Sequence, residues 1–293
     1  MSIDTNHSND AEEFRKVLRV LVNGERVNVN PDTLRLAGLN KVLLHVLRIV
    51  DYQGDLRREQ EERLRRIINM VREIEYALEG IDHAFIKLVK PVIYVPADID
   101  ILVRKDQVLL ATIRLIRRGY SVLLYEPYTI TLVKDGINVD LYVHPSAASL
   151  VYARGEEFLD LKATGEYHGV KITTIERHAE VVLAILHAVY KEGIITLNDA
   201  LTVMFWLNND AVNLCARLGC MNAMELALSV TYLAIRKSLI LPYKLPISVW
   251  FTYLLTRTLG NRRYTSSILQ GIKRVGDGKF IPQLINRIMR TSY

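Results

Sequence analysis

Three aspartates in two short segments carry the clearest chemical signal in the sequence. Asp98 and Asp100 stand one residue apart in YVPADIDILV, and Asp140 stands in INVDLYV. Because side chains alternate between the two faces of a strand, Asp98 and Asp100 point the same way, while Ile99 and Ile101 point into a core. The same alternation puts Asp140 opposite the apolar face of its own strand. We therefore predict three carboxylates on one side of a sheet.

Carboxylates held this close repel one another and raise each other's pKa unless a positive charge lies among them. A divalent cation supplies that charge, and Mg²⁺ favours oxygen ligands from a few carboxylates together with substrate phosphates. Two such ions ~3.5–4 Å apart can activate an attacking hydroxyl and stabilise the leaving oxygen of an in-line displacement. We predict Asp98, Asp100 and Asp140 as ligands of Mg²⁺ or Mn²⁺. The alternative is an exposed strand edge whose carboxylates cap the turn after Pro96.

The segments that must position these aspartates change from helical to extended periodicity at residue 83. Five short runs rich in β-branched and aromatic residues predict strands, namely AFIKLV, DIDILV, YSVLLYE, YTITLVK and INVDLYV. Between the second and third lies a predicted helix, DQVLLATIRLIRRGY, with Asp106 as its N-cap and Gly119 as its stop. Lys134, Asp135 and Gly136 form a hairpin turn. This order predicts an α+β fold with a small mixed sheet and helices packed against it.

Helices are predicted on both sides of this core. Before it run AEEFRKVLRVLV, LNKVLLHVLRIV and the charged LRREQEERLRRIINMVREIEYALEG, which has one apolar stripe and a solvated Arg/Glu face. After a connector at 147–174, which holds a further strand candidate HGVKITT, the remaining chain has helical periodicity. We predict an N-terminal helical region over 1–80, an α/β core over 81–175 and an all-helical C-terminal domain over 176–293.

Composition narrows the class of protein. The 293 residues are half apolar, carry a formal charge of +6 and include two cysteines, Cys215 and Cys220. The charge favours an anionic partner such as a nucleotide or a nucleic acid. The cysteine spacing fits neither a disulfide framework nor a CxxC metal pair, so we expect two core-filling thiols in a reducing compartment. With no signal peptide and no uninterrupted apolar run of ~20 residues, we expect a soluble cytoplasmic protein without a membrane partner.

The order of these segments resembles a known superfamily. A strand ending in FIK, a D-x-D strand, a helix, a hairpin and a lone Asp in its second strand look like the nucleotidyltransferases with the DNA polymerase β-like palm. More closely, AFIKLVKPVIYVPADIDILV, RRGY, NVDLYVH and HAVYKEGIITLNDAL resemble uncharacterised archaeal and bacterial nucleotidyltransferase family proteins. The resemblance covers roughly residues 60–205. It implies a nucleotidyltransferase-like sheet and Mg²⁺-dependent or Mn²⁺-dependent transfer of a nucleoside monophosphate from an NTP, such as ATP, to a hydroxyl.

The resemblance also implies a role for each matching residue. Asp98 and Asp100 would hold both metal ions and the triphosphate. Asp140 would complete the ion that activates the acceptor hydroxyl, and Lys87 would face the incoming phosphates. The alternative for Lys87 is an ion pair with Asp98 or Asp100. The Gly-Ser pair that usually precedes the D-x-D in this superfamily is absent, and the segment KLVKP fills that region. We therefore expect Lys87 and Lys90 to replace its backbone contacts with phosphate by side-chain charge.

Several further charged residues are candidates for the same site. Arg104 and Lys105, just past the D-x-D strand, are predicted either to contact the triphosphate or to remain solvated loop charges. His144 is either a general base or a structural histidine at a strand end. The helical residues that match the family pattern are expected to fix the helical domain; these are Glu180, His187 and Asp199. The C-terminal cations and aromatic residues form either a nucleic-acid grip or a solvated helix face; they are Arg262, Arg263, Lys273, Arg274, Arg290, Tyr264 and Phe280.

The sequence leaves the acceptor open among an RNA such as tRNA, a protein hydroxyl and a small molecule. One alternative function is a catalytically inactive nucleotidyltransferase fold that binds nucleotide or nucleic acid, which the missing Gly-Ser pair favours. A second alternative is one component of a toxin-antitoxin system. These readings share the three aspartates and differ in whether a transfer reaction takes place there.

Overall fold

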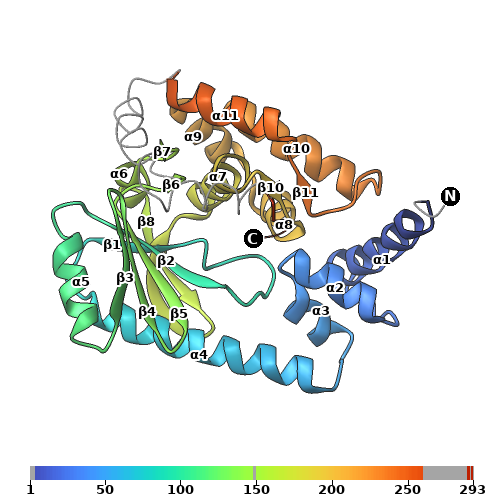
Figure 1. The fold of residues 1–293 in the computed structure, drawn as a ribbon, viewed down its shortest axis with the longest axis horizontal. Coiled ribbons are helices and arrows are strands. Elements are labelled where there is room, and N and C mark those ends of the chain that lie inside the picture. The colour runs from blue at the N-terminus through green and yellow to red at the C-terminus, as the bar shows by residue number, and fades with distance from the viewer. Residues whose placement is uncertain (1–3, 148–149, 260–288, 291, 293) are drawn as a thin grey trace.

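The computed structural model describes residues 4–147, 150–259, 289–290 and 292, and it is a mixed α/β fold (Figure 1). A seven-stranded sheet lies at its centre, with helices packed against it as predicted. Its strands, in spatial order, are β3 (Ser121–Glu126), β4 (Thr129–Lys134), β5 (Ile137–Tyr142), β2 (Asp98–Val103), β1 (His83–Ile86), β9 (Val170–Ile175) and β8 (Lys162–Tyr167). β2 pairs in parallel with β5, and β1 with β9, whereas the other neighbours are antiparallel. The sheet is therefore mixed.

The predicted hairpin joins β4 to β5. Its two-residue turn consists of Asp135 and Gly136, which have φ angles of 51° and 72°. A two-residue turn with both φ angles positive matches the twist of the flanking strands, and Asp followed by Gly is suited to it. The hairpin places β5 directly beside β2, so the strand of Asp140 lies next to the strand of Asp98 and Asp100.

Different helices cover the two faces of the sheet. α4 (Asp55–Ala77) and α5 (Val108–Ile116) pack on the face that carries Ile99, Ile101 and Val139. The other face carries Ala84, Ile86 and Leu102, which share a core with the C-terminal helices. Figure 1 shows α4 beneath the sheet and the C-terminal helices above it. Since Asp98 and Asp100 alternate with the isoleucines of β2, they point toward the C-terminal helices.

Among its described residues, the C-terminal part contains helices and one small sheet. Its helices are α7 (Arg177–Leu186), the π-helix η1 (His187–Glu192), α8 (Leu197–Trp206), α9 (Asn209–Leu218), α10 (Met221–Ile235) and α11 (Ile247–Leu259). β10 (Ile194–Ile195) and β11 (Tyr243–Lys244) pair antiparallel, so the expectation of an all-helical part is wrong at this point. Gly193 ends η1 with a φ of 62° directly before β10, and its carbonyl accepts the N–H of Leu245, which follows β11. Across the described residues, no helix has the length and apolarity to cross a membrane.

The predicted connector holds more structure than its one strand candidate. It contains β6 (Ser146–Ala147), β7 (Leu150–Val151), the short helix α6 (Gly155–Leu159) and β8. β8 pairs along its whole length with β9, the strand that HGVKITT predicts. β8 was missed because its sequence, KATGEY, has almost no apolar side chains to show a period of two.

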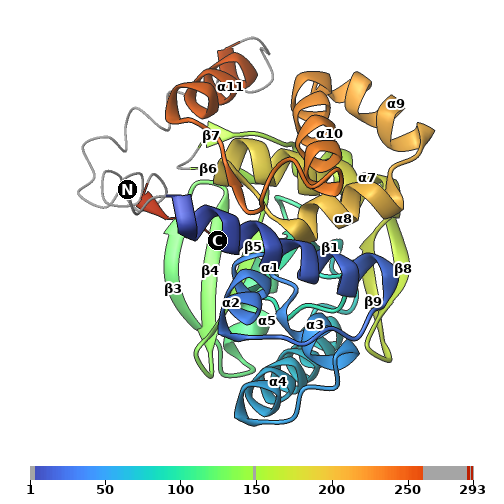
Figure 2. The same ribbon diagram turned by 90° about the vertical axis from the view of Figure 1, so that its right-hand side faces the viewer.

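The N-terminal helices pack against the C-terminal ones. They are α1 (Asp4–Asn23), α2 (Pro31–Leu39) and α3 (Leu43–Ile49), and α2 starts with a capping box between Asn30 and Thr33. Figure 2 shows them in front of the sheet, between the C-terminal helices at the top and α4 at the bottom. Phe14 and Leu36 share one buried core with Leu201. The division at residues 80 and 175 stays a prediction, and packing crosses both positions.

Two local predictions need correction. Asp106 does not cap α5: a turn closed by the Gln107 N–H and the Arg104 carbonyl delays the helix until Val108. Cys215 and Cys220 form a disulfide rather than two thiols, although both are buried as expected. Gly219, between them in the chain, adopts a φ of 67° and ends α9. The chain turns back there, and the two Cα atoms lie 5.1 Å apart.

A half-buried carboxylate on α4 holds β9 and predicts sensitivity to acid. Glu75 accepts hydrogen bonds from the N–H and the hydroxyl of Thr173, and it lies 3.2 Å from Nε2 of His83. Burial alone would raise the pKa of Glu75, but these bonds outweigh burial and hold the pKa below its ordinary 4.5. Because the folded-state pKa is depressed, this stabilisation is present above pH 4.5 and is lost as pH falls through the folded-state value.

We expect Glu75→Gln to lower the free energy of unfolding at pH 7 by about 1–2 kcal/mol, since a neutral amide accepts these bonds more weakly. The difference from wild type should shrink as the pH falls from about 5 to about 3. Urea denaturation at each pH measures it, and Glu62→Gln, on the exposed side of the same helix, is the matched control. A difference that stayed constant over this range would contradict the role given to Glu75.

Candidate functional site

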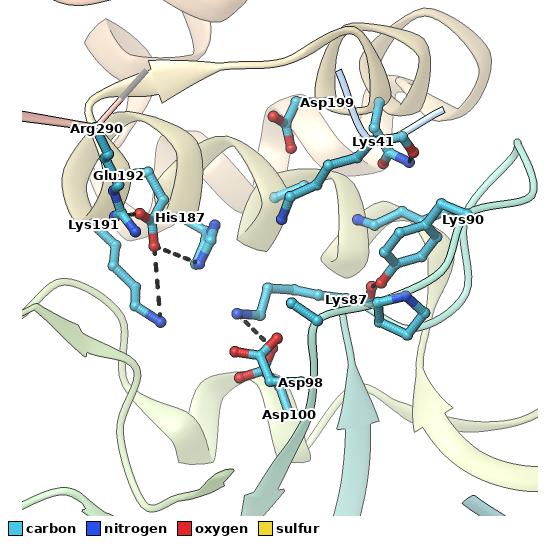
Figure 3. Close-up of a pocket in the computed structure, with 15 residues that line it drawn as sticks. Lys41, Lys87, Lys90, Asp98, Asp100, His187, Lys191, Glu192, Asp199 and Arg290 are labelled. Atoms are coloured by element: carbon cyan, nitrogen blue, oxygen red, sulfur yellow. Dashed lines mark hydrogen bonds and ion pairs between the residues drawn. The ribbon is translucent and has the colours of Figure 1, made fainter. Parts of the chain in front are cut away.

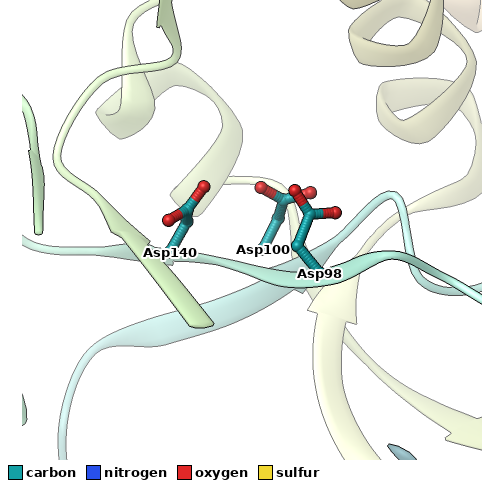
Figure 4. Close-up of side chains that lie close together, drawn as sticks. All are labelled: Asp98, Asp100 and Asp140. Atoms are coloured by element: carbon teal, nitrogen blue, oxygen red, sulfur yellow. The ribbon is translucent and has the colours of Figure 1, made fainter. Parts of the chain in front are cut away.

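The three aspartates meet on the sheet face that lies toward the C-terminal helices (Figure 4). The parallel register of β2 and β5 pairs Asp100 directly with Asp140. Asp98 stands two residues before Asp100 on the same face of β2. One oxygen atom from each of the three side chains lies within 4.8 Å of the other two. Together these side chains form what we call the aspartate cluster.

Asp100 is the most enclosed member of the aspartate cluster, with 5% of its surface exposed. Its Oδ2 lies 2.7 Å from Nζ of Lys87. Its Oδ1 is buried and has no hydrogen-bond partner in the described part of the chain. Burial by itself raises the pKa of Asp100, but the adjacent Lys87 ammonium outweighs burial and keeps the pKa below its ordinary value. Asp100 is thus an ionised carboxylate with one unsatisfied oxygen.

Asp140 is held in place by neighbouring hydroxyl groups. Thr131 donates to Oδ1 at 2.6 Å, and Tyr142 donates to Oδ2 at 3.0 Å. Lys191 donates to the same Tyr142 hydroxyl at 3.1 Å. Burial, together with the charge of Asp100, raises the pKa of Asp140 to about 6. Such a shift marks a place where negative charge is crowded and where a cation is favoured.

Lys87 reaches Asp100 from a loop whose backbone is tightly held. Its φ of 60° lies in the left-handed region, which costs a residue other than glycine about 1–3 kcal/mol unless its surroundings hold it. The Lys87 N–H donates to the Glu180 carboxylate at 3.0 Å, and the Lys87 carbonyl accepts from the Tyr94 hydroxyl. Glu180 also binds Nζ of Lys90 at 2.8 Å. These contacts fix the end of β1 so that the Lys87 ammonium meets the aspartate cluster.

A cavity of about 280 Å³ adjoins the aspartate cluster (Figure 3). Its wall carries lysines from three parts of the chain: Lys41 follows α2, Lys87 and Lys90 follow β1, and Lys191 lies in η1. Burial, opposed by the charge of Asp199, lowers the pKa of Lys41 to about 8. A cationic wall beside carboxylates is suited to a ligand that carries both phosphates and a bound cation.

Arg104 and Lys105 lie away from this cavity, which corrects their prediction as triphosphate contacts. Asp98 begins β2 and Arg104 follows its other end, about 20 Å away at the rise of an extended strand. Arg104 is paired with Asp82 at 2.7 Å and with Asp160 at 3.3 Å, while Lys105 is exposed. Arg104 is thus partly buried in its ion pairs, and Lys105 is exposed, at the end of β2 opposite to Asp98.

The other candidates divide between the cavity and the scaffold. His187 and Asp199 line the cavity, and Asp199 also closes a capping box at the start of α8. Nε2 of His187 lies 3.2 Å from Glu192, and burial, reinforced by the neighbouring lysines, lowers the pKa of His187 well below its ordinary value. Nδ1 of His144 accepts the N–H of Gly155 at 3.1 Å, and His144 does not line the cavity. His144 thus contacts the backbone of Gly155 outside the cavity.

Of the C-terminal candidates, Arg290 belongs to the described residues. It lines the cavity and pairs with the buried Glu192. The remaining positions lie outside the described residues, and they are Arg262, Arg263, Lys273, Arg274, Tyr264 and Phe280. Binding of nucleic acid by these residues stays a prediction.

Three residues of the site were missed at the level of sequence. Tyr142 follows Asp140 by two positions and so shares its face, which strand alternation was sufficient to reveal. Lys191 stands within HAVYKE, but its direction depends on the wider turn of the π-helix. Lys41 has no local signal, because it reaches the cavity only through the packing of α2 and α3 against the C-terminal helices.

The site combines three acidic oxygen ligands with a cationic wall. The aspartate cluster offers ligands that a hard divalent cation prefers, and the lysines of the cavity offer donors to phosphate oxygens. No family model matches the chain, and neither does any curated protein.

Proposed function

We propose that this chain transfers a nucleoside monophosphate from an NTP to a hydroxyl group, in a reaction that depends on Mg²⁺ or Mn²⁺. The observation that carries the proposal is the state of Asp100. Its carboxylate is buried beside Asp98 and Asp140, and its Oδ1 has no partner among the described residues. Burying an ionised oxygen without a partner costs several kcal/mol. A cation shared among the three carboxylates removes that cost.

The proposed reaction assigns a task to each part of the site. Asp98, Asp100 and Asp140 hold the cation, which supplies polarisation of the phosphoryl group and stabilisation of the leaving oxygen. Lys41 and Lys191 face the triphosphate from the cavity wall. The acceptor oxygen attacks the α-phosphorus, the bond from that phosphorus to the bridging oxygen of the β-phosphate breaks, and pyrophosphate leaves with the electron pair. The hydroxyl proton is released to water.

The arrangement of strands supports this proposal. The D-x-D strand β2 lies beside β5, which carries the third aspartate, and a helical part lies over the carboxylate face. These placements are compatible with the resemblance to nucleotidyltransferases on which the proposal draws. The formal charge of +6 favours an RNA acceptor such as tRNA over an uncharged one.

A second candidate is an inactive nucleotide-binding module. The ion pair of 2.7 Å between Lys87 and Asp100 favours it, because a lysine already occupies one side of the aspartate cluster. In this case the cavity binds NTP, and no phosphoryl group is transferred.

A label-transfer assay separates the two candidates. The purified chain is incubated with Mg²⁺ or Mn²⁺, each α-labelled NTP in turn and total RNA, beside an Asp98→Ala/Asp100→Ala variant. We expect label on RNA with the wild type and background with the variant. An Asp106→Ala/Asp210→Ala variant, which removes two exposed aspartates, controls for the change in charge and should retain activity.

Each result of this assay has a defined meaning. Label on the chain itself, or on an added protein, would replace RNA by a protein acceptor. A thermal shift with NTP and no transferred label would support the inactive module. Absence of both label and any shift with metal or NTP would contradict nucleotide binding altogether.

A further inference from the structure

We infer that the aspartate cluster takes one divalent cation rather than two, because the Lys87 ammonium occupies the second cationic position at Asp100. The inference rests on the proposed function, and it concerns how many ions the site uses. Two-metal sites hold ions ~3.5–4 Å apart on shared carboxylates. Here the Lys87 ammonium, and not a metal ion, contacts one oxygen of the Asp100 carboxylate.

The contact between Lys87 and Asp100 is close and enclosed. Nζ lies 2.7 Å from Oδ2, and the side chains of Lys87 and Asp100 are 13% and 6% exposed. A second ion at the same Asp100 oxygen would lie against the ammonium and be repelled by it. The oxygen that remains for a cation is the unpartnered Oδ1, which is enough for one ion shared with Asp98 and Asp140.

The charges of the aspartate cluster also indicate one divalent ion. Three carboxylates carry three negative charges, and the Lys87 ammonium supplies one positive charge. The two negative charges left over are neutralised by one divalent ion. A second ion would make the cluster positive beside Lys41 and Lys191, both of which line the same cavity.

Lys87 is also held against moving aside for an ion. Glu180 and Tyr94 fix its peptide groups in the left-handed conformation. Its Nζ lies 5.8 Å from the centre of the Tyr142 ring, where a cation is attracted by the face of the ring. Displacing the ammonium would break the ion pair and this contact together. The backbone of Lys87 is therefore held in place, and the ion pair and the ring contact retain its ammonium beside Asp100.

Counting bound Mn²⁺ tests the inference without measuring activity. The full chain, free of nucleotide, is titrated with Mn²⁺, and the free ion is measured by electron paramagnetic resonance. We expect one ion for each wild-type chain, two for Lys87→Met, and none for Asp98→Ala/Asp100→Ala. Lys105→Met, which removes an exposed lysine at the far edge of the sheet, should bind one ion like the wild type.

The outcomes distinguish this inference from the proposed function. Two ions on the wild type, or one on a folded Lys87→Met, would overturn the single-ion site and leave the transferase proposal standing. No ion on the wild type, or the same ion retained in the double aspartate variant, would also overturn the single-ion site, and the label-transfer assay would then decide the transferase proposal separately. If Lys87→Met does not fold, anomalous diffraction from Mn²⁺-soaked wild-type crystals decides the matter, since one peak at the cluster is expected and two would overturn the inference.

Discussion

Replacing Asp100 by asparagine is expected to lower the free energy of unfolding by about 3 kcal/mol, whereas the same change at Asp98 leaves it unchanged or raises it. The two aspartates stand two residues apart on one strand face, but only Asp100 is paired in a buried contact with Lys87. Removing one partner of a buried pair leaves the other charge without compensation, which typically costs about 3–5 kcal/mol. The asparagine carbonyl retains a dipole toward Lys87, so we expect the lower end of that range.

The opposite expectation for Asp98 follows from its surroundings. Asp98 is half-buried and lies beside two other carboxylates, so its charge raises the energy of the metal-free cluster. Asp98→Asn removes that repulsion. Urea denaturation at pH 7 in the presence of a chelator measures both variants, and equal destabilisation of the two would contradict the unequal roles. Both variants should lose Mn²⁺ binding. Asp98→Asn should therefore abolish ion binding without lowering the free energy of unfolding.

A double-mutant cycle isolates the pair itself. If the destabilisation of Asp100→Asn comes from a buried Lys87 ammonium that has lost its counter-charge, adding Lys87→Met should recover part of the lost free energy of unfolding. Additive losses in the double variant would show instead that each residue acts through other contacts. Met is chosen because it retains the length and the apolar stem of the lysine side chain.

The aspartate cluster could be predicted from sequence because its causes are local. Alternation within β2 puts Asp98 and Asp100 on one face, and alternation within β5 does the same for Asp140. The Asp135-Gly136 turn is equally local, since it depends on two adjacent residues. These short-range rules were sufficient for β1 to β5 and β9 and for the carboxylates of β2 and β5, but not for β8.

The cationic half of the site depends on contacts between distant segments. Lys87 points at Asp100 because Glu180, 93 residues later, holds its peptide N–H. Lys41 and Lys191 come from segments that are far apart in the sequence, and both line the cavity. The disulfide joins residues only five positions apart, and it was not predicted because the turn at Gly219 interrupts the helix that the periodicity indicated. Periodicity specifies faces, but it does not specify which faces meet.

Asn40 is where the distant segments are joined, and replacing it by alanine is expected to lower the free energy of unfolding by about 3 kcal/mol. Asn40 is 0% exposed. Its Nδ2 donates to the carbonyls of Leu36 and Leu241 at 3.0 Å and 2.6 Å, and its Oδ1 accepts the N–H of Leu197 at 2.8 Å. Alanine leaves the groups of Leu241 and Leu197 buried without this partner, at about 1–3 kcal/mol each.

The matched variants separate hydrogen bonding from side-chain size. Asn40→Asp retains the shape and the acceptor for Leu197, but it points a negative oxygen at two carbonyls, so we expect a larger loss than with alanine. Asn23→Ala, on the exposed end of α1, should change the free energy of unfolding by less than about 0.5 kcal/mol. A loss at Asn40→Asp smaller than at Asn40→Ala would contradict the donor role. Since Lys41 follows Asn40 and lines the cavity, the folded Asn40→Ala protein should also bind NTP more weakly, because the Asn40 side chain no longer holds this segment to Leu197 and Leu241.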